Sequence, residues 1–174
     1  MELSKYVACI CEGAAEQAII ELLLDNGKLI FTRDNLLDGE ILRCRSAKNF
    51  EKQHLRKGFT EQITVLRILD SRSEKFKLSK AYEHKIKVVN VITAPEIEML
   101  VIITEGKYSD YKNKHSDIKP SEYCKVNLGH SDVKSAEFIK QYFGDVDSLV
   151  NAIREYKRVT NVLTGEYALA GLLN

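Results

Sequence analysis

The sequence has little that breaks, crosslinks or anchors a chain. Its 174 residues include only nine glycines and two prolines, which excludes collagen-like and low-complexity disordered chains. The cysteines contain no C-x-x-C pair, so zinc-finger spacing is absent and a reducing cytoplasm is the expected location; they are Cys9, Cys11, Cys44 and Cys124. No stretch reaches the roughly 18 apolar residues of a membrane span, so no membrane association is expected.

The chain also lacks an excess of charge of either sign. Its 26 basic and 25 acidic residues give a formal charge of +1, whereas binders of nucleic acid that depend on counterion release are usually basic overall. The charges are unevenly distributed, however. Residues 12–40 hold seven acidic and two basic side chains, and residues 43–57 hold six basic and one acidic. Near neutrality therefore does not exclude a phosphate substrate.

Short apolar runs alternate with helical patterns over the first two thirds of the chain. The runs predict strands at 5–11, 40–45, 61–69 and 84–92, and the patterns between and after them predict helices at 14–27, 47–57 and 95–106. Ser46 and Thr93 are the expected N-caps of the second and third helices. This alternation predicts an α/β fold with a small, mostly parallel, four-stranded sheet and flanking helices.

The remaining third is rich in lysine and predicts further helices at 120–128, 133–143, 146–159 and 165–173. Residues 107–119 are polar and charged and predict a mobile connection. We therefore expect an α/β core over 1–106 and a helical extension over 107–174, packed together as one compact unit. The extension offers a surface for a protein partner or for a second copy of the chain.

Acidic residues follow the predicted strands. Glu12 ends the first, Asp70 ends the third, and Glu96 and Glu98 begin the helix after the fourth. The carboxyl ends of parallel strands face the ligand crevice, and carboxylates gathered there need a cation or a shared proton to offset their repulsion. Magnesium suits such oxygen ligands best. Taken singly, each residue also fits a helix cap, a turn or a favourable position at a helix dipole.

Three of these elements resemble parts of the TOPRIM domain: CEGAAE after the first strand, ILD at the end of a later one, and TAPEIEML at a helix start. The likeness is greatest to small prokaryotic TOPRIM proteins of the RloB-like type and weaker to the OLD-family nucleases. It implies a nuclease that uses Mg²⁺ or Mn²⁺ on phosphodiesters, in phage defence or a mobile element. It also implies that Glu12 and Asp70 are catalytic and that Glu12, Asp70 and Glu98 hold the metal.

The sequence departs from the TOPRIM pattern at two places. Arg72 stands where the family has its second aspartate, and Ala94 replaces the asparagine before Pro95. A guanidinium cannot ligate a cation, so Glu74 is the alternative ligand. The alternative function is a catalytically degenerate module that binds nucleic acid or a protein. A restriction-type nuclease is disfavoured, because no strand carries an aspartate followed by an E-x-K pair.

Two basic segments are candidates for binding nucleic acid. Arg45, Lys48, Lys52 and Arg56 recur at three- and four-residue spacings and predict a stripe on one helix face. Arg72 and Lys75 follow Asp70 directly. If both segments border the acidic residues, they form a phosphate track around a metal centre; the alternative is an ordinary solvated surface.

Overall fold

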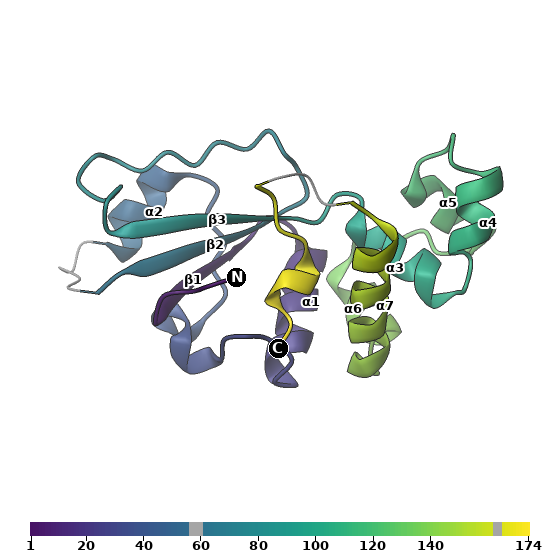
Figure 1. The fold of residues 1–174 in the computed structure, drawn as a ribbon, viewed down its shortest axis with the longest axis horizontal. Helices are drawn as coiled ribbons and strands as arrows, with labels where there is room; N and C mark the ends of the chain where they lie inside the picture. The colour runs from purple at the N-terminus through teal and green to yellow at the C-terminus, as the bar shows by residue number, and fades with distance from the viewer. Residues whose placement is uncertain (56–60, 162–164) are drawn as a thin grey trace.

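A three-stranded parallel sheet forms the centre of the protein's α/β half. The computed structural model describes residues 1–55, 61–161 and 165–174. The strands are β1 (Tyr6–Cys11), β2 (Ile63–Leu69) and β3 (Ile86–Ile92), in the order β1-β2-β3. The molecule is elongated, with the sheet at one end and most of the helices at the other (Figure 1).

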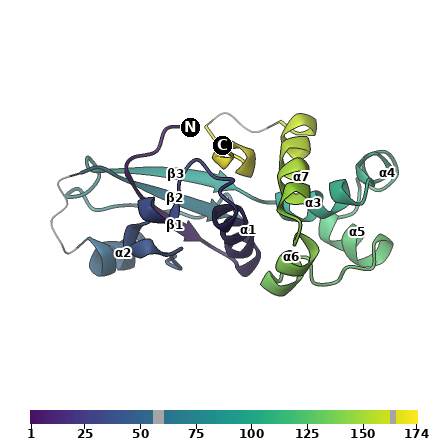
Figure 2. The same ribbon diagram turned by 90° about the horizontal axis from the view of Figure 1, so that it is seen from below.

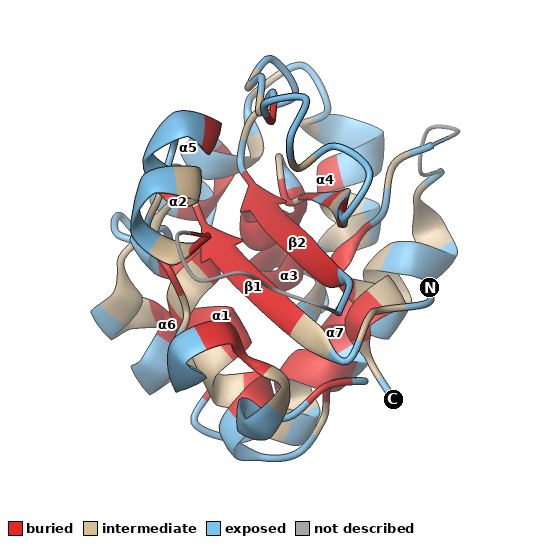
Figure 3. Ribbon diagram, turned by 90° about the vertical axis from the view of Figure 1, so that its left-hand side faces the viewer, coloured by how far each residue is buried: buried red, intermediate tan, exposed pale blue. Residues whose placement is uncertain are grey.

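Both faces of β1 and β2 are covered, which explains why these two strands read as nearly continuous apolar runs, whereas Lys87 and Asn90 of β3 are exposed. All seven residues of β2 are buried, and Figure 3 shows the buried strands surrounded by helices with exposed outer surfaces. Alternate side chains of the strands enter two separate cores. Leu66 and Ile68 belong to a core shared with α1 and α3, while Ala8 and Val65 pack with Phe50 of α2.

Seven α-helices lie in the described part of the chain outside the sheet. Ser46 caps α2 by accepting a hydrogen bond from the backbone N–H of Asn49, as its position predicted. The helices are α1 (Ala14–Asp25), α2 (Ala47–His54), α3 (Glu96–Thr104), α4 (Tyr108–Lys114), α5 (Pro120–Asn127), α6 (Ala136–Tyr142) and α7 (Val146–Val159).

The helices after residue 107 extend the core that the sheet begins. In sequence order, α6 packs against α1, and α7 packs against α3. Leu149 and Ile153 of α7 are fully buried in the same core cluster as Leu66. Figure 2 shows α6 and α7 beside α1 and α3, with α4 and α5 outermost. The extension therefore brings its loops close to the ends of the strands.

The prediction of four strands was wrong. Residues 40–45 form no strand. Leu42 makes one bridge to Ile10, through its N–H to Cys9 O and its carbonyl to Cys11 N. On this same edge of β1 the described residues make one more isolated bridge, between Leu36 and Val7, and a 3-10 turn (η2, Leu37–Gly39) lies between the two bridges. Isolated bridges cover this edge of the sheet without forming a ladder.

Two predictions for the last third were also wrong. Part of the expected connection at 107–119 forms α4, which is anchored by the buried Tyr111 against Tyr123 at 5.1 Å between ring centroids. The expected helix at 165–173 is only a 3-10 turn (η3, Leu169–Leu172), because Tyr167 pairs with the free edge of β3 by accepting a hydrogen bond from Ile92 N–H at 2.8 Å. None of the described helices has the length and apolarity that crossing a bilayer needs.

Candidate functional site

Four carboxylates gather where the three parallel strands end; we call Glu12, Glu16, Asp70 and Glu98 the carboxylate edge. Glu12 follows β1 and Asp70 follows β2, and the two are joined by a hydrogen bond of 3.2 Å from the Asp70 backbone N–H to Glu12 Oε2. Burial raises the pKa of Glu12, and the charges of Asp70 and Glu74 raise it further. The sequence-predicted pair, Glu12 and Asp70, is therefore brought together.

Glu16 is a member of the site that the sequence analysis missed. It lies in the first turn of α1, only 3% exposed, and the Thr93 hydroxyl donates to its Oε1 at 3.2 Å. Burial raises its pKa, and the Asp70 charge adds to that effect. The available signal was its position in the first turn of the helix that follows the first strand, four residues after Glu12.

Gly13 provides the room for the Glu16 carboxylate. Its backbone is extended, with φ −115° and ψ 171°, a conformation open to any residue. A Cβ at this position would collide with Glu16 Oε2. The Glu16 carboxylate therefore folds back over the helix start into space that a side chain at position 13 would have to share.

Glu98 is, with Glu16, one of the two buried carboxylates of this edge. It lies in the first turn of α3, 5% exposed, with its Oε1 at 3.4 Å from the Lys134 ammonium. The same ammonium lies 4.0 Å from Asp70 Oδ2. Glu98 Oε2 is buried and has no hydrogen-bond partner among the described residues. Asp70 and Glu98 thus share one cation, supplied by the helical extension.

Glu96, the neighbouring acidic residue, serves a different place in the fold. It is 1% exposed, and its Oε2 accepts a hydrogen bond from the backbone N–H of Leu169 at 3.3 Å. Burial raises its pKa to about 8, so at neutral pH the side chain is mostly protonated. Glu96 therefore ties η3 to α3 as a neutral acid.

A second group of charges lies on the opposite face of β2. Arg67 is 2% exposed, with Nη2 at 3.5 Å from Glu74 Oε2 and its guanidinium stacked 4.8 Å from the Phe76 ring. Glu74 is therefore held by an arginine. Arg67, Glu74, Glu12 and Arg45 line a cavity of about 10 Å³, close to the volume that one water molecule needs. A charge within the apolar run ITVLRIL was the sequence signal for this group.

Arg72, which stands at the position of the second family aspartate, forms an ion pair. Its Nε donates to the two carboxylate oxygens of Glu166 at 3.0 and 3.3 Å. Glu166 lies just before Tyr167, which pairs with β3. The arginine thus attaches the C-terminal segment beside the carboxylate edge.

The structure separates the other predicted nucleic-acid-binding residues. Arg45 lines the small cavity beside Glu12, whereas Lys48 and Lys52 are exposed on α2. Lys75 is exposed and lines a different groove with Ile86 and Val88, of about 420 Å³. Arg56 lies outside the described residues. The predicted stripe therefore begins at the acidic site and continues away from it along α2.

Whether these residues suit a metal can be judged from the arrangement of their oxygens. Across residues 1–55, 61–161 and 165–174, no three His, Cys, Asp or Glu side chains lie close enough together to enclose a metal ion. Asp70 and Glu98 nevertheless share a single ammonium, and the second oxygen of Glu98 is buried without a partner. This pair fits a cation, with Glu12 and Glu16 beside it.

A scan against protein-family models, a search of curated proteins and a search of solved structures each found no match to this chain.

Proposed function

We propose that this protein is a divalent-cation-dependent enzyme that cleaves phosphodiesters of nucleic acid at the carboxylate edge. The supporting observation is the buried, unpartnered Glu98 Oε2 beside an ammonium shared with Asp70. An ionised carboxylate in such a place needs a cation. The likeness of CEGAAE, ILD and TAPEIEML to TOPRIM elements favours the same chemistry.

In this proposal each of the four carboxylates has a role that follows from its surroundings. Asp70 and Glu98 would hold Mg²⁺ or Mn²⁺, and the bound ion would offset the negative charge on the phosphate. Glu12 is the proton-transfer residue: its raised pKa brings the carboxyl closer to neutral pH, and the Asp70 N–H fixes its position. Glu16, held by Thr93, adds negative charge behind Asp70.

The test of this function combines cation binding with cleavage. We expect the purified protein to bind Mn²⁺ in calorimetry and to cleave single- or double-stranded DNA or RNA in Mg²⁺ or Mn²⁺. EDTA should stop cleavage and restoring the cation should recover it. A protein that neither binds Mn²⁺ nor cleaves any of the four substrates contradicts the proposal.

The second candidate is a degenerate module that binds nucleic acid without cleaving it. Two observations favour it: the Lys134 ammonium already pairs with Asp70 and Glu98, and Arg72 stands in place of an acidic ligand and pairs with Glu166. This candidate predicts no Mn²⁺ binding together with salt-sensitive affinity for nucleic acid. The calorimetry above therefore separates the two functions.

Both functions place nucleic acid along α2. We expect the double variant Lys48→Glu, Lys52→Glu to bind single-stranded nucleic acid more weakly. The slope of log affinity against log salt should fall in magnitude by about 2, because each lysine that contacts a phosphate releases roughly one counterion from the nucleic acid. Fluorescence anisotropy over a salt series measures this slope.

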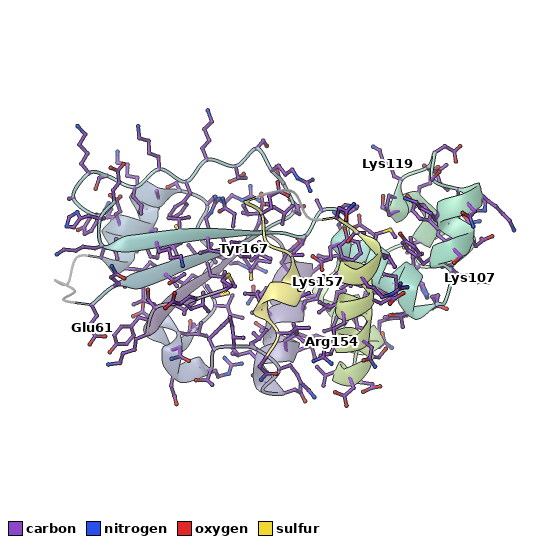
Figure 4. The ribbon with its side chains drawn as sticks, in the orientation of Figure 1. Glu61, Lys107, Lys119, Arg154, Lys157 and Tyr167 are labelled. Carbon is purple, nitrogen blue, oxygen red and sulfur yellow. The ribbon has the colours of Figure 1, made fainter. Side chains whose placement is uncertain are left out.

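The matched control for that variant reverses two charges elsewhere. Arg154 and Lys157 are exposed on α7, in the helical half of the molecule (Figure 4). The variant Arg154→Glu, Lys157→Glu changes the net charge equally and should leave the slope nearer to that of the wild type. An equal loss in both variants indicates general electrostatic attraction and contradicts a track on α2.

A further inference from the structure

Lys134 is a residue of the helical extension whose charged end lies among the side chains of the α/β core. Its ammonium is 3.4 Å from Glu98 Oε1 and 4.0 Å from Asp70 Oδ2, and its charge also acts on Glu16. These carboxylates belong to the ends of different strands, or to the helices that follow them, so the lysine occupies the point on which they converge.

The backbone at Lys134 is fixed on both sides. Val133 is 3% exposed and lies in the main core. Ser135 caps α6 by accepting a hydrogen bond from the Phe138 N–H at 3.0 Å, and its own N–H donates to Asp132 O at 2.8 Å. The ammonium is therefore delivered by a fixed loop, not by a freely moving tail.

The side chain, in contrast, has space to leave. The Lys134 side chain is 49% exposed, whereas that of Glu98 is 7% exposed. Lysine carries its charge on a flexible four-carbon stem, so rotation of the side chain moves the ammonium into water without moving the backbone. The buried Glu98 carboxylate cannot follow the ammonium. When the ammonium leaves, both oxygens of Glu98 are left without a cation.

We infer that Lys134 is a built-in counter-cation of the carboxylate edge, which a divalent metal ion must displace from Asp70 and Glu98 in order to bind. This inference rests on the proposed function and adds a control of metal affinity to it. The ammonium and the metal carry like charge and compete for the same oxygens. The lysine therefore keeps the buried carboxylate stable without metal and sets the concentration of metal at which the site fills.

The test compares Mn²⁺ binding by wild-type protein and by Lys134→Met, measured by calorimetry or by the loss of the free-Mn²⁺ signal in electron paramagnetic resonance. Methionine keeps much of the stem and removes the charge. We expect at least about tenfold tighter binding, since a unit charge within about 4 Å is removed, with allowance for solvent screening. Lys134→Arg, which retains the charge, should stay near the wild type.

Lys140→Met is the matched control, because Lys140 on α6 pairs with Glu21 at 2.8 Å, outside the carboxylate edge. It removes one positive charge and should change the affinity much less than Lys134→Met. Should methionine unfold the protein, Lys134→Gln makes the same comparison, with circular dichroism confirming the fold.

The outcomes separate this inference from the proposed function. Wild-type binding that Lys134→Met leaves unchanged or weakens overturns the role of Lys134 and leaves the metal site standing. If Lys140→Met tightens binding as much as Lys134→Met does, the effect is a general one and the inference also fails. Absence of Mn²⁺ binding in wild type and in Lys134→Met alike overturns the proposed metal site, and the displacement with it.

Discussion

Asp70→Asn is expected to lower the rate of cleavage by about 10²- to 10⁴-fold and to remove detectable Mn²⁺ binding. The range is typical of the loss of one group that acts on the reacting atoms in an active site. Asparagine retains the size of the side chain and leaves the backbone N–H that binds Glu12 at 3.2 Å. The variant therefore changes the charge of the carboxylate edge and keeps its geometry.

The same substitution changes the electrostatics of three neighbours. The Asp70 charge helps to raise the pKa of Glu12 and of Glu16, so both values should fall in the variant. Lys134 loses one of its two acidic partners and keeps Glu98. Single-turnover cleavage rates at saturating nucleic acid measure the chemical step directly.

The control is Asp34→Asn, which changes an exposed aspartate of η1 (Arg33–Asn35). Asn35 of the same turn donates to Lys5 O, just before β1 begins, so η1 lies at the opposite end of the sheet from the carboxylate edge. It should cleave at the wild-type rate. An Asp70→Asn protein that retains wild-type cleavage would show that another site performs the reaction.

The three strands could be predicted from the sequence because local patterns define them. A parallel strand covered on both faces is a continuous apolar run, as in residues 63–69, and its boundaries are visible without knowledge of the fold. Residues 40–45 have a similar but weaker pattern. Whether they form a ladder depends on how the chain approaches the outer edge of β1, where the described residues make bridges at Leu36 and Leu42. Tertiary contacts, and not the local pattern, therefore determine that residues 40–45 form no strand.

Some residues of the candidate site could likewise be predicted from local patterns in the sequence, and others could not. Glu12, Asp70 and Glu98 could be predicted because each immediately follows a strand or begins a helix, and parallel topology brings such positions to one edge. Lys134 carries no such signal. It is 36 residues beyond Glu98 and reaches the site because α6 packs against α1. Spacing along the chain cannot reveal such a partner, because only the packing of two distant helices places it at the site.

Glu96→Gln is expected to make the folded protein more stable above pH 5 and to flatten the dependence of its stability on pH. The pKa of Glu96 is about 8 in the folded protein, against an ordinary value of 4.5. Between these values the unfolded chain releases the proton that the folded protein keeps, so the folded state binds more protons and the free energy of unfolding falls as pH rises. Above pH 8 both states are ionised and this dependence ends.

The size of the effect follows from the two pKa values. Their difference, 8 minus 4.5, at about 1.4 kcal/mol for each pH unit, sets an upper limit of about 5 kcal/mol on the stability regained at pH 8. Glutamine cannot ionise. Its carbonyl oxygen can accept the Leu169 N–H in place of Glu96 Oε2, and its amide stays neutral where the carboxylate would be buried.

Tyr156, the titratable group that faces Glu96 from α7, has little effect on the expected pH dependence of the free energy of unfolding. Tyr156 on α7 has its pKa raised to about 12, chiefly by burial and next by the charge of Glu96, so it stays neutral through the window from pH 5 to 8. Urea unfolding at several pH values in EDTA, which keeps cations from Glu98, measures the difference between Glu96→Gln and wild type. The exposed Glu83→Gln is the control. A difference that stays constant from pH 5 to 8 would mean that Glu96 does not titrate there in the folded protein.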